Sequence, residues 1–384
     1  MNGRGAAAPA RLRELDVRDF RNLARVELAP PAEGFVVIGE NGQGKTNLLE
    51  SIHYLQILRS VRGARDQDLV RFGADAFHIG ALAEGGATHE IGVGFERAGK
   101  RKRIRLDGAI VDRLSVALGA LPSVMFSPDD VELIAGAPNA RRRYLDIMLA
   151  LSTRGYLTAL QKYRGALTRR NAALRGAART NRASIEQSVA VWEPALAEHG
   201  AVIWSARAAW VEAAAERFQE LCAAIGESAC VGLRYSSGIQ AGDDIAAALA
   251  RALDEKRGHD LRRGLTHAGP HRDDLAITLD ARDLRTFGSA GQQRSAAIAM
   301  RMLEAETFAV RTGRTPLFLL DDPFAELDAR RATRILDLLT RDGESRAEQQ
   351  IILAVPREGD IPGELTRLDR LRVADGRVAR YADA

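Results

Sequence analysis

Eight consecutive residues near the start of the chain have the composition of a phosphate-binding loop. They fit the P-loop pattern G-x-x-x-x-G-K-[ST], with a short apolar run before them and apolar residues at helical spacing after them. In such a loop, backbone N–H groups curl around phosphate oxygens, and the N-terminus of the following helix adds partial positive charge. Lys45 would reach the β- and γ-phosphates, and Thr46 would give a hydroxyl ligand to Mg²⁺. The predicted nucleotide-binding residues are Gly39, Glu40, Asn41, Gly42, Gln43, Gly44, Lys45 and Thr46.

A pair of adjacent carboxylates, Asp321 and Asp322, follows the apolar run at residues 316–320. Two ionised carboxylates side by side repel each other, so this pair predicts a chemical role rather than a packing role. At the carboxyl end of a buried parallel strand, Asp321 would hold Mg²⁺ through its water shell, as a Walker-B acid does. Asp322 would orient or deprotonate the attacking water.

Residues 288–292 read Gly-Ser-Ala-Gly-Gln, and apolar residues at helical spacing follow them. Ser289 with Gln292 three residues later fits a capping box, which alone accounts for both side chains. A helix N-terminus with glycine amides and a serine hydroxyl is also equipped to hold a phosphate. The second interpretation adds Ser289, Gly291 and Gln292 to the predicted nucleotide-binding residues.

Two basic segments are candidates for contact with the DNA backbone. The first comprises Lys100, Arg101, Lys102 and Arg103, in a predicted β-hairpin, where a charge run is often only a solvated tip. The second is a group of arginines around a predicted turn between helices, namely Arg169, Arg170, Arg175, Arg179 and Arg182. For both segments, phosphate contact and simple solvation remain open.

The elements that must position these residues alternate between strands and helices. Alternation and turn residues predict a hairpin over residues 12–28, a buried strand at 35–38 and an antiparallel sheet over 77–106. Residues 140–225 have helical periodicity, with three tryptophans expected in the core between the helices. Further strands are expected at residues 275–279, 316–320 and 350–355, and a helix after Ser289. We therefore expect an α/β P-loop fold with an antiparallel β subdomain, divided into residues 1–140, a helical arm at 141–265, and residues 266–384.

Length, charge and composition exclude some classes of protein. The chain has 384 residues, a formal net charge of +4, and no run of apolar residues long enough to cross a bilayer. Residues 1–13 lack the apolar core of a secretion signal, and we expect them to be disordered and the protein to be cytoplasmic. The residues from Thr266 to Asp274 include two histidines and two aspartates without regular ligand spacing, which favours a loop over a metal site.

In their order and spacing, these motifs resemble the ABC/SMC class of ATPases, and within that class the RecF family of bacterial recombination mediators. Further points of similarity are residues 19–22, 126–130, 141–146, 170–175 and 269–274. The resemblance implies a Rad50-like ATPase head with a helical arm, which forms a homodimer on binding ATP and Mg²⁺. Ser289 and Gly291 would then meet the γ-phosphate held by the other protomer. It also implies slow DNA-dependent ATP hydrolysis, binding to single-stranded and gapped DNA, and cooperation with RecR, RecO and RecA.

Several features depart from the class pattern. Gly288 and Ala290 replace the leucine and the first of the paired glycines of the signature, Pro323 follows the acidic pair, and Pro356 stands near the position of a switch histidine. A transporter ATPase subunit is disfavoured because Ser289 lies 243 residues after Thr46. A full SMC chain is disfavoured because there is no room for a long coiled coil. The remaining alternative is a nucleotide-gated DNA clamp with negligible hydrolysis.

Overall fold

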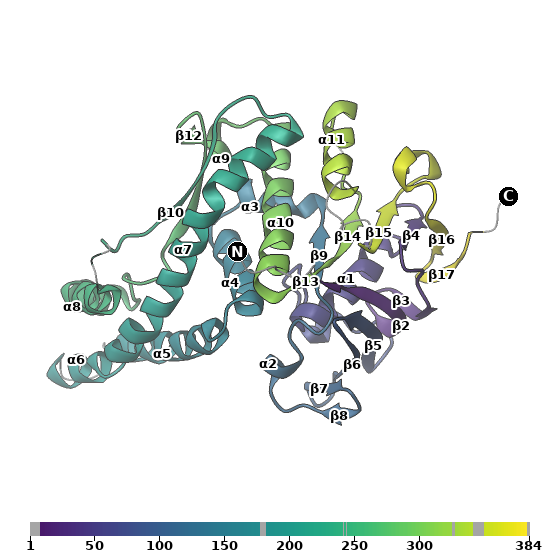
Figure 1. Ribbon diagram of the computed structural model, residues 1–384. Helices are drawn as coiled ribbons and strands as arrows, with labels where there is room; N and C mark the ends of the chain where they lie inside the picture. Colours follow the sequence, from purple (N-terminus) through teal and green to yellow (C-terminus); the bar gives the residue numbers. More distant parts are fainter. Residues whose placement is uncertain are drawn as a thin grey trace. The chain divides into compact units, whose positions relative to one another are not determined.

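A computed structural model describes residues 8–176, 182–240, 242, 244–324, 327–340 and 349–381 (Figure 1). The chain divides into two units. The first comprises Met1–Asp130, Ala224–Gly226 and Ile298–Ala384, and the second comprises Val131–Ala223 and Glu227–Ala297. In the part of the chain that the structure describes, no helix is both long and apolar enough to span a membrane.

The centre of the first unit is a six-stranded sheet in the order β17-β16-β4-β15-β14-β9, in which only the edge strand β17 is antiparallel to its neighbour. Its strands are β4 (Gly34–Ile38), β9 (Ser123–Phe126), β14 (Leu317–Asp321), β15 (Ile351–Val355), β16 (Asp369–Ala374) and β17 (Arg377–Arg380). All residues of β4, β9, β14 and β15 are buried, which explains why these strands are apolar except for Ser123 and Asp321. The expected strands at 35–38, 316–320 and 350–355 are thus confirmed to within a residue.

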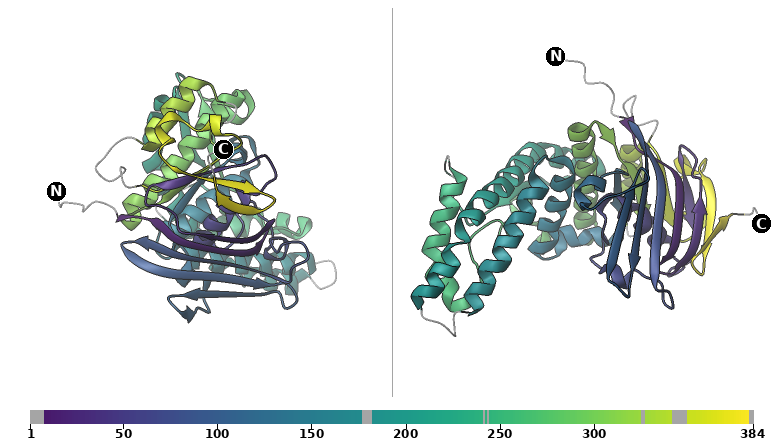
Figure 2. Two further views of the ribbon diagram at one scale, coloured as in Figure 1. Left: turned by 90° about the vertical axis from the view of Figure 1, so that its right-hand side faces the viewer. Right: turned by 90° about the horizontal axis from the view of Figure 1, so that it is seen from below.

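A second six-stranded sheet of this unit is antiparallel, with the order β3-β2-β5-β6-β7-β8, and Figure 2 shows its strands side by side. The strands are β2 (Arg11–Phe20), β3 (Leu23–Leu28), β5 (Ala76–Gly85), β6 (Ala87–Glu96), β7 (Arg101–Leu106) and β8 (Ala109–Ile110). The predicted hairpin is confirmed by the pairing of Val17 with Val26. Alternate residues such as Val17, Ile79 and Val93 are buried in one core with Leu48 and Ile52 of α1 (Lys45–Ile57).

The start of the chain corrects one expectation. Residues 8–13 are not disordered, because β1 (Ala8–Pro9) pairs in parallel with β13 (Arg314–Thr315) and β2 begins at Arg11. Residues 1–7 lie outside the described part. The other elements of this unit are α2 (Leu114–Ala117), η1 (Asp66–Asp68), α11 (Ala329–Thr340), η4 (Glu358–Asp360) and η5 (Gly363–Leu365). η2 (Pro128–Val131) crosses the boundary between the units after Asp130.

The second unit is mainly helical. Its elements are α3 (Glu132–Ala135), α4 (Pro138–Ser152), α5 (Tyr156–Gly176), α6 (Arg182–Ala190), α7 (Glu193–Ile225), α8 (Ile245–Arg263) and α9 (Leu284–Phe287), with a small sheet of β10 (Val231–Ser236), β11 (Asp274–Leu279) and β12 (Arg282–Asp283). The last two residues of α7 belong to the first unit, and α10 (Ala290–Thr312) begins in the second unit and continues from Ile298 in the first. Trp210 is buried with its ring against Tyr144, as expected of a core residue.

The limits of the units differ from the expected boundaries at residues 140 and 265. Residues 266–297 cluster with the helical unit because β11 packs on α4 and α9 packs on α3. The signature segment therefore belongs to the helical unit, whereas the P-loop and the acidic pair both belong to the first unit.

Candidate nucleotide-binding site

The P-loop connects β4 to α1, and its glycines are favoured by close contacts or by left-handed backbone angles. A Cβ atom on Gly39 would lie 2.4 Å from the backbone oxygen of Val373 in β16. Gly42 has φ 82° and Gly44 has φ 119°, and a Cβ on Gly44 would lie 2.8 Å from Oδ1 of Asn22. Glycine adopts these left-handed values without the steric cost that other residues incur. The predicted strand, loop and helix are all present.

Lys45 lies inside this loop rather than in solvent. Its side chain is largely buried, and Nζ donates hydrogen bonds to the backbone oxygens of Gly39 at 2.5 Å and Glu40 at 3.0 Å. Burial lowers the pKa of Lys45, and the nearby carboxylates of Asp321 and Asp322 act in the opposite direction. The ammonium group is thus close to the acidic pair, although the two segments are far apart in sequence.

Asp321 ends β14 and is buried, which raises the pKa of its carboxyl group. A hydrogen bond with Thr46 and the charges of Lys45 and Arg62 oppose this rise. A carboxylate and a hydroxyl in contact are hard oxygen donors of the kind that Mg²⁺ prefers. Thr46 and Asp321 therefore have the donor chemistry and the proximity that a magnesium site needs.

Asp322 leaves the strand with a left-handed backbone, at φ 45°. Its N–H donates to the backbone oxygen of Ala354 in β15 at 2.9 Å, which ties the turn to the neighbouring strand. A non-glycine residue in this conformation costs about 1–3 kcal/mol, which the surrounding structure must supply. The charge of Asp322 acts to raise the pKa of Lys45, which indicates that the Asp322 carboxylate lies near the Lys45 ammonium group.

The signature segment forms the capping box that the sequence predicted. The N–H of Ser289 donates to Oε1 of Gln292 at 2.9 Å, and the N–H of Gln292 donates to Oγ of Ser289 at 3.3 Å. Ser289 is exposed, while Gly291 and Gln292 are partly exposed, at the start of α10 in the second unit. The helix N-terminus is thus accessible, and its capping interactions explain both polar side chains without a ligand.

Asn22 supports the P-loop, a role that the sequence does not predict. Its Nδ2 donates to the backbone oxygens of Gly42 at 3.3 Å and Gln43 at 3.0 Å, while its Oδ1 accepts from Asn47 at 2.8 Å. Next to it, Arg21 forms two hydrogen bonds of 3.1 Å with the buried Glu50 of α1. The sequence signals at these residues are the polar turn between two strands and the family resemblance of residues 19–22.

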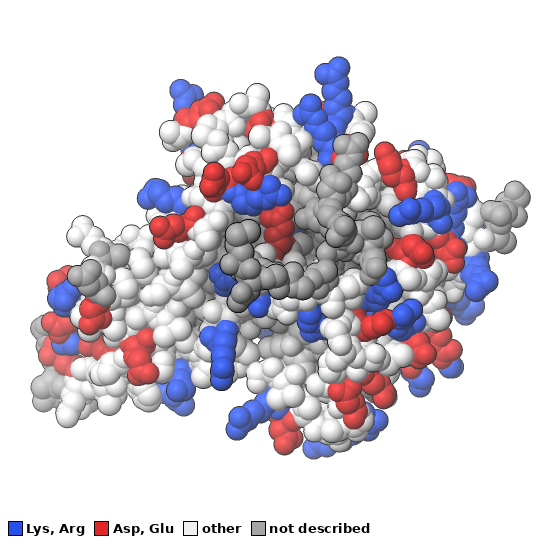
Figure 3. All heavy atoms as spheres, in the orientation of Figure 1, with Lys and Arg blue, Asp and Glu red and all other residues white. Residues whose placement is uncertain are grey.

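The four residues of the first basic segment differ in their exposure to solvent. Arg101 and Arg103 are exposed on β7, and Lys100 is exposed in the turn before it. Lys102 instead points inward: Nζ bonds to the Leu58 carbonyl and lies 3.2 Å from Asp66, and burial lowers its pKa. For Lys102, the structure therefore favours interior contacts over the phosphate contact that the sequence left open. On the face shown in Figure 3, basic and acidic side chains are interspersed, so charge there does not single out a phosphate-binding surface.

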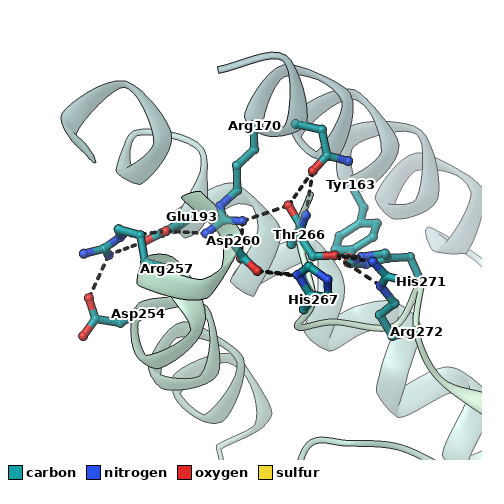
Figure 4. Close-up of polar contacts among 11 residues, drawn as sticks. Tyr163, Arg170, Glu193, Asp254, Arg257, Asp260, Thr266, His267, His271 and Arg272 are labelled. Atoms are coloured by element: carbon teal, nitrogen blue, oxygen red, sulfur yellow. Dashed lines mark hydrogen bonds and ion pairs between the residues drawn. The ribbon is translucent and has the colours of Figure 1, made fainter. Parts of the chain in front are cut away.

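The second basic segment also contains a buried arginine. Arg170 is fully buried, with bonds to Asp260 at 2.8 Å, Thr266 at 2.8 Å and Glu193 at 2.9 Å (Figure 4). It is a structural ion-pair residue and does not face a phosphate. Arg169 and Arg175 are exposed, whereas Arg179 and the side chain of Arg182 lie outside the described residues.

The polar loop at residues 266–274 has structural contacts. Asp273 accepts hydrogen bonds from Tyr235 and Ser237, at 2.6 and 2.8 Å, and Asp274 is ion-paired with Arg141 at 2.8 Å. His259, Asp260 and His267 bring potential ligand atoms within 4.8 Å of one another. Because Asp260 already pairs with the Arg170 guanidinium, this group is poorly suited to a cation.

Comparison with known proteins identifies the family. Residues 11–361 match the family model described as "RecF/RecN/SMC N terminal domain". The "DNA replication and repair protein RecF" of Myxococcus xanthus (strain DK1622) is 34% identical over 97% of this chain and 98% of its own length. That of Anaeromyxobacter dehalogenans (strain 2CP-C) is 40% identical over 83% and 86%.

Solved structures agree with this assignment. The "Structure of the recombination mediator protein RecF-ATPrS in RecFOR pathway" has a TM-score of 0.87, 29% identity, and coverage of 98% of this chain and 100% of that chain. An SMC head bound to the C-terminal winged-helix domain of ScpA has a TM-score of 0.54 at 15% identity, with 96% and 97% of the two chains covered, and shows a similar fold. This chain is a member of the RecF family.

Proposed function

We propose that the protein is an ATP-binding and ATP-hydrolysing DNA-repair protein that acts at single-stranded and gapped DNA. The observation that carries the proposal is the proximity, within one unit, of Lys45 to Asp321 and Asp322 and of Thr46 to the buried Asp321. A relative that covers nearly the whole chain is named a DNA replication and repair protein, and a similar solved structure is described as RecF-ATP. Both support the proposal.

Within the site, each residue has a separate role. Lys45 would exchange its two carbonyl partners for β- and γ-phosphate oxygens, which compensate a buried ammonium better than neutral carbonyls do. Thr46 and Asp321 would hold Mg²⁺, which neutralises developing phosphate charge. Asp322 would position the attacking water and accept its proton.

The signature completes the site in a homodimer that forms on ATP binding. The exposed N-terminus of α10, with Ser289, Gly291 and Gln292, would contact the γ-phosphate bound by the other protomer. The Ser289 oxygen accepts the capping bond from the Gln292 N–H, and its hydroxyl proton remains free to donate to the phosphate. The altered signature sequence supports slow rather than rapid turnover.

DNA and protein partners follow from the family. We propose that the protein binds gapped DNA and contacts RecR directly. RecO and RecA would act in the same pathway, and the protein would be located in the cytoplasm. Lys100, Arg101 and Arg103 are exposed and available for phosphate contact, whereas Lys102 is not. A clamp that binds ATP with negligible hydrolysis is the alternative, favoured only by the departures in the signature.

Binding to gapped DNA with and without ATP tests the proposal. Wild type should bind more tightly with ATP, Lys45→Ala should lose this dependence, and Lys256→Ala, which changes an exposed lysine of α8, should retain it. ATP-dependent DNA binding by Lys45→Ala would contradict the P-loop assignment. Single-turnover hydrolysis with and without DNA then separates the slow ATPase from the clamp.

A further inference from the structure

The turn between β16 and β17, near the C-terminal end of the chain, contacts the P-loop directly. The N–H of Gly376 donates to the backbone oxygen of Gln43 at 3.0 Å, and the N–H of Asp375 donates to Oε1 of the same residue at 2.5 Å. The Gln43 backbone oxygen also accepts the Asn22 amide at 3.0 Å. Two turns from distant parts of the sequence thus bind one P-loop residue.

These two turns also pack against each other with no spare room. Gly376 has φ 71°, and a Cβ atom on it would lie only 2.0 Å from the backbone oxygen of Asn22. Below the turn, β16 pairs with β4 as far as Arg372 opposite Ile38. The C-terminal hairpin therefore follows the strand that leads into the P-loop and then contacts the loop itself.

The contacts fix the orientation of the peptide group between Gln43 and Gly44. In a trans peptide the C=O and the following N–H point in opposite directions. Because the Gln43 oxygen accepts hydrogen bonds from Gly376 and Asn22, the N–H of Gly44 is directed away from both turns. The glycine at position 44 would otherwise let this peptide rotate easily.

We propose that Asp375 and Gly376 are positioning residues for the nucleotide, which keep the N–H of Gly44 in the orientation that binds phosphate. The proposal rests on the proposed ATP-binding function. A loop that is already ordered does not lose conformational entropy on binding, so more of the interaction energy appears as affinity. Nucleotide affinity is therefore linked to docking of the C-terminal hairpin.

A matched pair of glycine substitutions tests this inference. Gly376 and Gly313 have nearly equal φ values, 71° and 67°, but a Cβ on Gly313 meets no atom within 4 Å. Alanine at either position must adopt a left-handed backbone, so this conformational cost lowers the thermal stability of both variants by a similar amount. Gly376→Ala should bind ATP with Mg²⁺ at least about tenfold more weakly than Gly313→Ala, because only the first displaces the Asn22 turn.

The outcomes are separable. If wild type fails to bind ATP, the proposed function fails; if wild type and both variants bind it equally, the positioning role alone is overturned. Hydrogen exchange of the wild type gives a test without variants, because linkage is reciprocal and ATP must stabilise hairpin docking. ATP should slow exchange of the Asp375 and Gly376 amides but not of the Asp107 amide, in another glycine turn of this unit. Unchanged exchange at residues 375 and 376 would overturn the inference.

Discussion

Replacing Arg170 with methionine should destabilise the helical unit by about 3–5 kcal/mol, the usual cost of removing one member of a buried ion pair. The side chain is fully buried and its guanidinium bonds to Asp260, Glu193 and Thr266. Glu193 keeps a second partner in Arg257, whereas the fully buried Asp260 loses its only guanidinium partner among the described residues. Asp260 keeps its hydrogen bonds with the backbone N–H and the Nδ1 atom of His267, at 3.1 and 2.7 Å, but the loss of the guanidinium beside this buried carboxylate is the main source of the expected loss.

Thermal unfolding measures this effect. For a unit of this size, each kcal/mol lowers Tm by about 2–4 °C, so Arg170→Met should lower Tm by about 6–20 °C. The neighbouring Arg169 is exposed and lies 5.2 Å from the Trp192 ring centroid, so Arg169→Met should cost only about 0.5–1 kcal/mol. Adding Asp260→Asn to Arg170→Met should recover part of the loss, because it removes the stranded charge.

The reasoning fails if Arg170→Met unfolds no earlier than Arg169→Met, or if the double variant is no more stable than Arg170→Met. DNA binding gives an independent check. A phosphate contact by Arg170 would contribute about 0.9 to the slope of log affinity against log salt concentration. We expect that slope to be unchanged in Arg170→Met.

Three further predictions concern other charged residues. Asp322→Asn should slow single-turnover hydrolysis and prolong the lifetime of the ATP-bound protein on DNA; faster dissociation than wild type would contradict its role with water. Replacing Arg101 and Arg103 with glutamine should flatten the salt dependence of DNA affinity by about 0.9 per contact, whereas Lys102→Met should lower Tm and leave that slope unchanged. Burial raises the pKa of Glu193, but hydrogen bonds from Arg257 and Arg170 outweigh burial, so the pKa in the folded protein is lowered. The ionised Glu193 therefore stabilises the fold above its unfolded pKa, and this stabilisation is lost as the pH falls through the folded pKa. Glu193→Gln should therefore be less stable than wild type at pH 7, with a difference that shrinks in acid unfolding experiments.

The sequence predicted the P-loop and the buried strands well because their signals are local. Strand β4, the glycine loop and α1 follow one another directly, and each has its own periodicity or turn residues. The acidic pair was also recognisable, since a buried strand that ends in two carboxylates has few structural explanations.

The failures have a common physical cause, which is a partner distant in sequence. Residues 8 and 9 looked unstructured because their strand partners are residues 314 and 315. Lys102 and Arg170 looked exposed because their charge partners, Asp66 and Asp260, are 36 and 90 residues away. The contact between Gln43 and Asp375 spans 332 residues and left no local pattern.

Mixing two inactive variants tests the central claim, that each ATP site combines the P-loop of one protomer with the signature of the other. Lys45→Ala and Ser289→Arg should both be inactive as homodimers, because every site then contains one defect. In a heterodimer one site collects both defects and the other is intact, so DNA-stimulated ATP hydrolysis should partly return. Ser289→Ala controls for the lost helix cap, which costs about 1 kcal/mol. Heterodimers that demonstrably form with ATP and yet show no recovered hydrolysis would contradict a site shared between protomers.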